Sequence, residues 1–376
     1  MAGIYIHIPF CKTRCIYCDF FTQTDMSLRS RYVDAVCREL ELYSDYLGRE
    51  FVKTIYLGGG TPSQLTAQNY DKIFEAIHNN FAVLPDAEIT VEANPDDLDV
   101  EYIGELISLP FNRISIGVQS FDDAQLAFLN RRHSAERAKT VVEWCQQAGF
   151  NNISIDLMYG LPGQTMMSWF ETLNTAISLN VQHISSYHLI YEEGTQLNRL
   201  LEDGKIKSVD EDLSADLFLL LQTKLTSAGF IHYEISNFAK EGFFSRHNSS
   251  YWLGAPYLGI GSSAHSYNGK SRKWNISSVG KYIQGIEEGQ PLSETEYLSE
   301  NMLYNDFIIT RMRTIWGVDL EELERRFGKD KLEYCLRNIA KHINNKTVEK
   351  RNNTLIITER GMLVSDGIMS DLMYID

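Results

Sequence analysis

Three cysteines near the start of the chain could together hold an inorganic centre. Cys11, Cys15 and Cys18 are spaced four and three residues apart. They follow the segment 4–8, in which isoleucine alternates with tyrosine and histidine. This alternation predicts a short buried strand, which Pro9 ends because proline has no amide N–H to donate. The three thiols therefore lie on one loop, where each can reach a different corner of an iron–sulfur cubane.

Three thiolates leave one iron of a four-iron cluster without a protein ligand. That iron can chelate the amino and carboxylate groups of S-adenosylmethionine (SAM), and an added electron can then split the sulfonium bond to give a 5′-deoxyadenosyl radical. A structural zinc site needs a fourth ligand, for which His7 is a candidate. The third alternative is that the cysteines are inert core residues, which is the interpretation we prefer for Cys37, Cys145 and Cys335.

The elements that must position this loop alternate between strand and helix. Further strand-like runs are expected at 52–57, 88–92, 113–118, 152–157 and 183–188. Segments with helical periodicity, such as 31–42 and 135–149, lie between them. Six strands alternating with helices predict parallel βαβ units. We expect an α/β fold, a partial (β/α)6 barrel similar to a TIM barrel, over residues 1–240.

Ligand-binding residue types follow several of these strands, at the end of a barrel where active sites lie. The turn 58–62 contains three glycines, so its backbone is open to an amino-acid head group. Glu92, Gln119 and Asp156 lie at or just inside three successive strand ends. Carboxylates and an amide suit ribose hydroxyls and the positive charge of a sulfonium. Arg131 is a candidate for a carboxylate because guanidinium is a fork-shaped donor.

The cysteine spacing, with Tyr17 before the last cysteine, resembles the radical-SAM superfamily. Other runs resemble the family of oxygen-independent coproporphyrinogen III oxidases, which includes the HemW-type haem chaperones; they are 6–11, 58–62, 92–95, 112–121 and 156–162. The resemblance covers residues 4 to about 270. It implies a [4Fe–4S] cluster on the three cysteines and SAM contacts at Tyr5, Gly59, Gly60, Thr61, Glu92, Gln119, Arg131 and Asp156.

Two features separate the branches of this family. The decarboxylating oxidases have a fourth cysteine where this chain has Phe20. The run 247–252, His-Asn-Ser-Ser-Tyr-Trp, matches a signature of the haem chaperone branch. The resemblance implies that His247 binds haem, whereas the residues alone favour an aromatic plug closing the barrel. We therefore expect a chaperone that delivers haem to an apoprotein, with the oxidase as the alternative.

The rest of the chain is expected to form two further regions. Residues 241–294 carry the haem signature and a connection, and residues 295–376 form a small, mainly helical domain that resembles a winged helix. A hairpin is expected from strands at 346–350 and 354–358, followed by a helix over 359–373.

Composition limits the partners and the compartment. The formal net charge of −15 argues against a nucleic-acid binder. Six cysteines without a disulfide-type spacing, and no basic and apolar leader or apolar run of spanning length, predict a cytoplasmic protein, with peripheral membrane contact left open. Haem, a haem-accepting apoprotein and an electron donor for the cluster are the expected partners.

Overall fold

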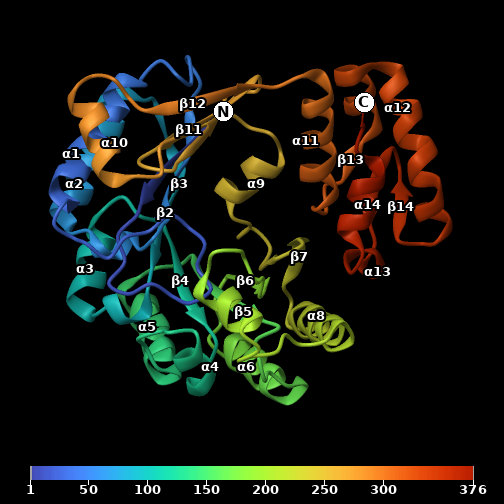
Figure 1. Ribbon diagram of the computed structural model, residues 1–376, viewed down its shortest axis with the longest axis horizontal. Helices are drawn as coiled ribbons and strands as arrows, with labels where there is room; N and C mark the ends of the chain where they lie inside the picture. The colour runs from blue at the N-terminus through green and yellow to red at the C-terminus, as the bar shows by residue number, and fades with distance from the viewer. Residues whose placement is uncertain (1, 376) are drawn as a thin grey trace.

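The computed structural model describes residues 2–375 and contains the six parallel strands expected from the sequence (Figure 1). They pair in chain order and are β1 (Ala2–Ile8), β2 (Val52–Gly59), β3 (Val83–Ala93), β4 (Arg113–Gln119), β5 (Ile153–Tyr159) and β6 (His183–His188). The prediction of an α/β partial barrel is therefore confirmed.

Helices cover the outer face of this curved sheet (Figure 1). Those that follow β1 to β5 are α1 (Arg29–Leu42), α2 (Ala67–Asn80), α3 (Val100–Ser108), α4 (Asp123–Phe128), α5 (Ala135–Ala148) and α6 (Met166–Ser178). α7 (Gln196–Glu202) and α8 (Glu211–Ser227) follow β6. Capping explains several boundaries: Asp99, Ser134 and Asp210 cap the starts of α3, α5 and α8, and Gly149 ends α5 with a positive φ of 106°.

Strands that the sequence analysis missed extend the sheet beyond the barrel. The full order is β12-β11-β10-β9-β1-β2-β3-β4-β5-β6-β8-β7. The added strands are β7 (Ile231–Glu234), β8 (Asn237–Ala239), β9 (Tyr257–Ile260), β10 (His265–Tyr267), β11 (Ser271–Asn275) and β12 (Ser293–Tyr297). β9 lies parallel to β1, so the region 241–294 continues the sheet of the first region. This region also contains α9 (Arg246–Trp252) and α10 (Val279–Glu287).

Alternation along each strand divides the barrel into an apolar outer face and a polar interior. Ile4, Ile6 and Ile8 are fully buried in the core that the helices cover. The intervening side chains contact other polar residues instead: Tyr5 donates to His7 of the same strand, or accepts from it, over 3.0 Å. The interior is thus built to hold polar groups.

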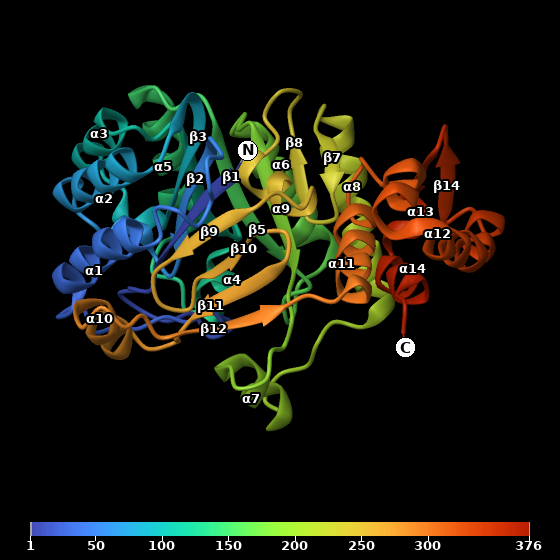
Figure 2. The same ribbon diagram turned by 90° about the horizontal axis from the view of Figure 1, so that it is seen from above.

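The last part of the chain has a hydrophobic core of its own, formed by residues between Tyr304 and Leu372. Its elements are α11 (Glu300–Met312), β13 (Val318–Asp319), α12 (Leu320–Asn344), β14 (Val348–Arg351), β15 (Thr354–Ile357), α13 (Glu359–Met362) and α14 (Ser365–Leu372). The expected hairpin is present, whereas the single helix expected over 359–373 is two helices. Figures 1 and 2 both place this unit at one end of the molecule, beside β7 and α8. The division at residues 240 and 294 stays a prediction.

No helix among residues 2–375 combines the length and the apolar character needed to cross a membrane.

Candidate functional site

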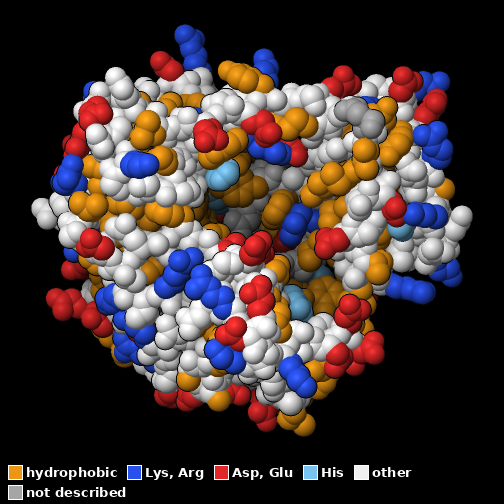
Figure 3. Space-filling view, in the orientation of Figure 1, with side chains coloured by type: hydrophobic (Ala, Val, Ile, Leu, Met, Phe, Trp, Pro, Cys, Tyr) orange, Lys and Arg blue, Asp and Glu red, His pale blue; other side chains and the backbone are white. Residues whose placement is uncertain are grey.

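A cavity of about 500 Å³ lies at the carboxyl ends of the barrel strands. Its walls include all three loop cysteines, the glycine turn and the strand-end polar residues that the sequence analysis singled out; these are Cys11, Cys15, Cys18, Gly59, Gly60, Thr61, Glu92, Gln119, Arg131 and Asp156. Figure 3 shows that the face viewed in Figure 1 is hollowed near its centre, with charged and hydrophobic side chains around the hollow. Residues far apart in the sequence are therefore brought to one site.

The cysteine thiols have hydrogen-bond donors beside them. The Thr61 hydroxyl lies 3.2 Å from Cys11 Sγ, and Arg131 Nη1 donates to Cys15 Sγ over 3.4 Å. Burial raises the pKa of Cys11, and raises that of Cys18 to about 11, so ionisation of these thiols requires a compensating positive charge. Iron provides such a charge, and the donors stabilise negative charge on sulfur. Three thiols facing one cavity therefore fit a cluster with three protein ligands.

The glycine turn brings backbone close to the cysteine loop. A Cβ on Gly60 would lie 2.7 Å from the Ile8 carbonyl oxygen and 3.2 Å from Cys11 Sγ. Gly59 has a φ of 106°, and a Cβ there would lie 2.3 Å from His7 Nδ1. Side chains at these two positions would displace the loop, so the turn leaves bare backbone beside the thiols. This arrangement fits the amino-acid end of SAM.

Two carboxylates form the polar floor of the cavity. Glu92 accepts from the Tyr56 hydroxyl at 2.7 Å and from the Gly59 amide at 3.1 Å. Burial, with a smaller contribution from the charge of Asp156, raises the pKa of Glu92 to about 7. Burial likewise raises the pKa of Asp156 to about 6. Both groups gain from a cationic ligand, and a sulfonium is one.

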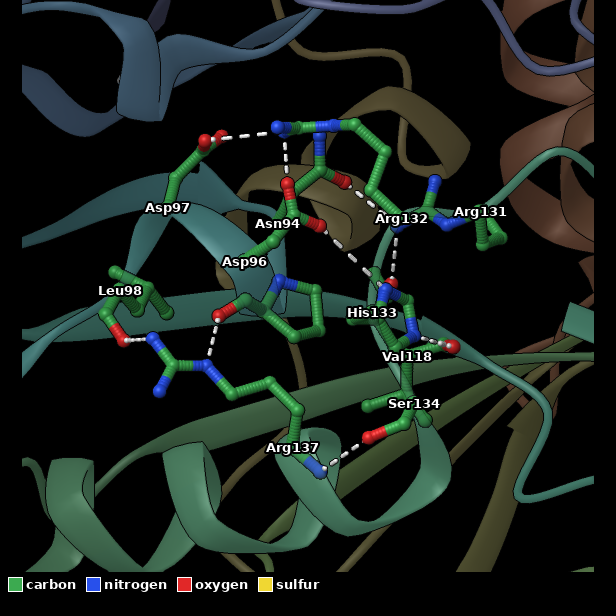
Figure 4. Close-up of polar contacts among 12 residues, drawn as sticks. Asn94, Asp96, Asp97, Leu98, Val118, Arg131, Arg132, His133, Ser134 and Arg137 are labelled. Atoms are coloured by element: carbon green, nitrogen blue, oxygen red, sulfur yellow. Dashed lines mark hydrogen bonds and ion pairs between the residues drawn. The ribbon is translucent and has the colours of Figure 1, made fainter. Parts of the chain in front are cut away.

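Arg131 is held rigidly at the cavity wall. Its Nη2 donates to Asn94 Oδ1 at 2.7 Å and to the Gly117 carbonyl at 2.6 Å. Figure 4 shows the neighbouring Arg132 reaching toward Asp96 and Asp97, so that the loop after α4 is tied to the loop after β3. The contacts of Arg131 with Asn94 and Gly117 use part of its guanidinium fork. In this conformation Arg131 therefore has fewer N–H donors left for a ligand carboxylate.

Gln119 has a strained backbone at the end of β4. Its φ is 68°, in the left-handed region that side chains other than glycine seldom adopt. The pairing of β4 with β5 also shifts register between Ile116 and Gln119. Strain of this kind is characteristic of functional sites, and here it accompanies a side chain on the cavity wall.

Tyr5 and His7 lie beneath the cavity and are not among its lining residues. Tyr5 pairs in register with Tyr56, below the level of Gly59, and its ring stacks on Tyr56 at 6.2 Å. The SAM contact at Tyr5 stays a prediction, and in this structure the Tyr5 side chain supports Tyr56 and His7. His7 contacts the Phe21 carbonyl through Nε2 at 2.9 Å and Tyr5 through Nδ1. Both ring nitrogens are engaged, which argues against zinc ligation and makes His7 a support for the cysteine loop.

His247 lies in the barrel interior near the opposite ends of the strands. It is 1% exposed, its Nδ1 lies 2.8 Å from the Thr54 hydroxyl, and its Nε2 lies 2.7 Å from the Tyr251 hydroxyl. Its ring stacks on Tyr56 with centroids 5.0 Å apart. Ligation of haem iron by His247 would break one of these buried hydrogen bonds and open the barrel. The geometry therefore supports the aromatic plug closing the barrel, which is the role that the residue types alone indicate for His247. It does not support a role as an iron ligand.

Asn94 and Tyr56 position the site, although neither was among the candidate site residues expected from the sequence. Asn94 Nδ2 donates to the Thr61 hydroxyl at 3.1 Å while Asn94 Oδ1 accepts from Arg131. Tyr56 holds Glu92 from below. Asn94 follows β3 by one residue, so the strand-end rule could have found it. Tyr56 lies within β2, and only the inward alternation of that strand indicates its direction.

Comparisons with known proteins agree with this architecture. Residues 5–176 match the radical SAM superfamily, and residues 298–364 match the HemN C-terminal domain. The haem chaperone HemW of Mycobacterium tuberculosis strain H37Rv is 33% identical, with 99% of this chain and 94% of that protein covered. The Bacillus subtilis haem chaperone HemW is 34% identical, with 98% of each chain covered.

A solved structure, coproporphyrinogen III oxidase (HemN) from Escherichia coli, is similar in fold. It has a TM-score of 0.85 at 22% sequence identity and covers 99% of this chain and 90% of that one. At this identity the likeness concerns the fold. The family is shown by the relatives above 30% identity over nearly the whole chain: the chain belongs to the radical-SAM family of the haem chaperone HemW.

Proposed function

We propose that this protein is a haem chaperone, which binds haem, a [4Fe–4S] cluster and SAM and delivers haem to an apoprotein. The observation that carries the proposal is the likeness over nearly the entire chain to proteins named haem chaperones. It extends through the C-terminal unit and is not confined to the barrel, which many unrelated activities share.

The cavity residues have distinct proposed roles. Cys11, Cys15 and Cys18 would hold the cluster, whose reduced form supplies the electron for cleavage of a sulfonium. The backbone of the glycine turn would bind the amino-acid end of SAM. Glu92 and Asp156 would balance its positive charge or accept from its ribose. An electron donor is then a required partner, and the exposed mouth gives it access.

Phe20 bears on the alternative, oxidative decarboxylation of coproporphyrinogen III. It lines the cavity and is 63% exposed at the position where the oxidase pattern has a further cysteine. A phenyl ring supplies neither a thiolate nor a polar contact there. The cavity wall therefore lacks a group that the decarboxylating branch carries, which favours the chaperone.

Haem binding and transfer by anaerobically reconstituted protein test this proposal. Haemin is titrated while the Soret band is followed, and the loaded protein is then mixed with apomyoglobin as a generic acceptor. We expect binding near one haem per chain and transfer on mixing. A Cys11, Cys15 and Cys18 to alanine variant, which should lose iron and sulfide, shows whether the cluster is needed for either step.

The same preparation, supplied with SAM, a reductant and coproporphyrinogen III, is assayed for protoporphyrinogen. Repeated turnover of that substrate would contradict the chaperone assignment. Failure to bind haemin at micromolar concentration would contradict it as well.

A further inference from the structure

A second cavity lies where the barrel meets the C-terminal unit, away from the cysteines. It is bounded by α9 and the turn after it, by β9 to β11, and by α11 and α12; its residues are Tyr251, Trp252, Leu253, Gly254, Tyr257, Tyr267, Arg272, Leu303, Asp306, Phe307, Thr310, Arg311 and Arg326. Its volume is about 220 Å³. Enclosed ligand sites usually measure about 300–1,000 Å³, so a large ligand would be only partly buried here. Partial burial suits a cargo that must be released.

Aromatic rings form most of the apolar wall. Tyr251 and Tyr257 meet edge to face with centroids 4.5 Å apart, and Tyr257 lies 6.3 Å from Tyr267. Trp252 and Phe307 complete the aromatic set, from α9 and α11. These rings come from separate elements and make one wall of the cavity apolar and aromatic, which suits an aromatic ligand.

Three arginines face this aromatic wall from three elements. Arg272 is on β11, Arg311 on α11 and Arg326 on α12, whereas Asp306 is the one acidic residue among the lining residues. Arg311 and Arg326 share Glu322, at 3.2 Å and 3.4 Å, and Arg272 pairs with Asp306. Each guanidinium has five N–H donors, so these pairs fix the forks in place and leave donors for a ligand. Glu296 also lies 3.7 Å from Arg272, so carboxylates offset the charge of all three arginines. A ligand carboxylate would therefore be bound by the N–H donors that these pairs leave, and not by an excess of positive charge.

We infer that this interdomain pocket, and not His247, binds the tetrapyrrole cargo, with the ring against the tyrosines and Trp252 and with its two propionates on Arg272, Arg311 and Arg326. The inference rests on the proposed function for the identity of the cargo. It assigns the recognition to the ring faces and the carboxylates, so the iron is not required for binding.

His247 then acts as a positioning residue. Its Nε2 holds the Tyr251 hydroxyl at 2.7 Å, while Thr54 fixes the other ring nitrogen at 2.8 Å. The imidazole thereby sets the angle of a ring on the pocket wall without touching the cargo. A glutamine can contact both hydroxyls, so His247→Gln should keep the haemin spectrum of the wild-type protein.

The experiment compares full-length variants in binding haemin, iron-free protoporphyrin IX and haemin dimethyl ester. Arg311→Gln with Arg326→Gln should raise the Kd of the first two by about tenfold or more, as expected for lost charge-assisted hydrogen bonds. The ester should bind weakly even to the wild-type protein. Arg325→Gln is the matched control, since Arg325 adjoins Arg326 on α12 but is not among the lining residues. Iron content and thermal unfolding verify that each variant is folded.

The possible results test the location of the binding pocket and the proposed function separately. Equal porphyrin binding by the wild-type protein and the double arginine variant would overturn the pocket while the chaperone proposal stands. The inference would also be overturned if His247→Gln changes the Soret or electron paramagnetic resonance signal and protoporphyrin IX does not bind. His247 would then be the residue that binds the haem iron. If the wild-type protein binds no haemin, the proposed function itself fails.

Discussion

The protonation state of Glu92 should control the affinity of the barrel cavity for a cation. Burial raises its pKa to about 7 and that of Asp156 to about 6. A proton on either carboxyl competes with the positive charge of SAM, so affinity for SAM should rise with pH between about 5.5 and 7.5. Anaerobic calorimetry across this range measures the effect.

In Glu92→Gln the step near pH 7 should disappear and the step near pH 6 should remain. Affinity for SAM that is independent of pH in the wild-type protein would contradict an ionised carboxylate opposite the sulfonium.

His247 makes a separate, structural contribution that depends on pH. Burial lowers its pKa from 6.5 to about 3, so the folded state excludes a proton that the unfolded chain accepts. Stability should therefore fall as the pH drops below 6.5, by up to about 1.4 kcal/mol per pH unit until the pH approaches 3. Denaturant unfolding of wild-type protein and His247→Gln at pH 7 and pH 5 should show the smaller loss in the variant. His78→Gln, at an exposed position on α2, should behave like the wild-type protein.

At the level of residues, the sequence identified what lines the cavity better than what supports it. Spacing and strand-end position led to the cysteines, Glu92 and Asp156, because these rules depend on local geometry. The predictions of a SAM contact at Tyr5 and a haem contact at His247 rest on the runs in which these residues lie. The direction of each side chain depends instead on neighbours from other strands. The Tyr56 ring packs against both of these rings, and no local pattern reveals those contacts.

The turn after β2 is the element most sensitive to a small change. Gly60→Ala would place a Cβ 2.7 Å from the Ile8 carbonyl oxygen and 3.2 Å from Cys11 Sγ, so the loop of cysteines must move. We expect lower iron and sulfide content after reconstitution and weaker SAM binding. Gly104→Ala is the matched control, because Gly104 lies within α3 with open space around it and alanine favours a helix by about 0.5–1 kcal/mol. Full cluster content in Gly60→Ala would contradict the close approach.

Elements with strong periodicity were predicted from sequence, and short ones were not. The six parallel strands and the hairpin near residue 352 have clear alternation or turn signals. β9 to β12 have three to five residues each and contain glycine, serine and charged residues, so their strand character comes from pairing with β1 and with one another. Tertiary contacts determine whether such short segments form strands.

At the level of the whole molecule, a buried carboxylate joins the first helix to the late part of the chain. Glu39 on α1 is fully buried and accepts from the Gly261 amide at 2.8 Å, Asn275 Nδ2 at 2.7 Å and the Tyr282 hydroxyl at 2.7 Å. Glu39→Ala would leave these donors without their acceptor and should lower the free energy of unfolding by about 3–5 kcal/mol. Glu41→Ala, at an exposed position of the same helix, should change it by no more than about 0.5 kcal/mol.

Thermal or urea unfolding measures both variants. An equal, small effect at the two positions would show that α1 and residues 261–282 are not energetically joined.

The pairing of β1 with β9 has a consequence for biosynthesis. β1 presents the cysteine loop, and one of its two edges pairs with a strand that begins at residue 257. A ribosome must therefore add some 250 residues after β1 before that edge can be covered. During this interval the outer amides and carbonyls of β1 are open to other nascent strands, and closing so long a loop is slow. The strand that leads into the cysteine loop is thus among the last parts of the sheet to have both of its edges paired.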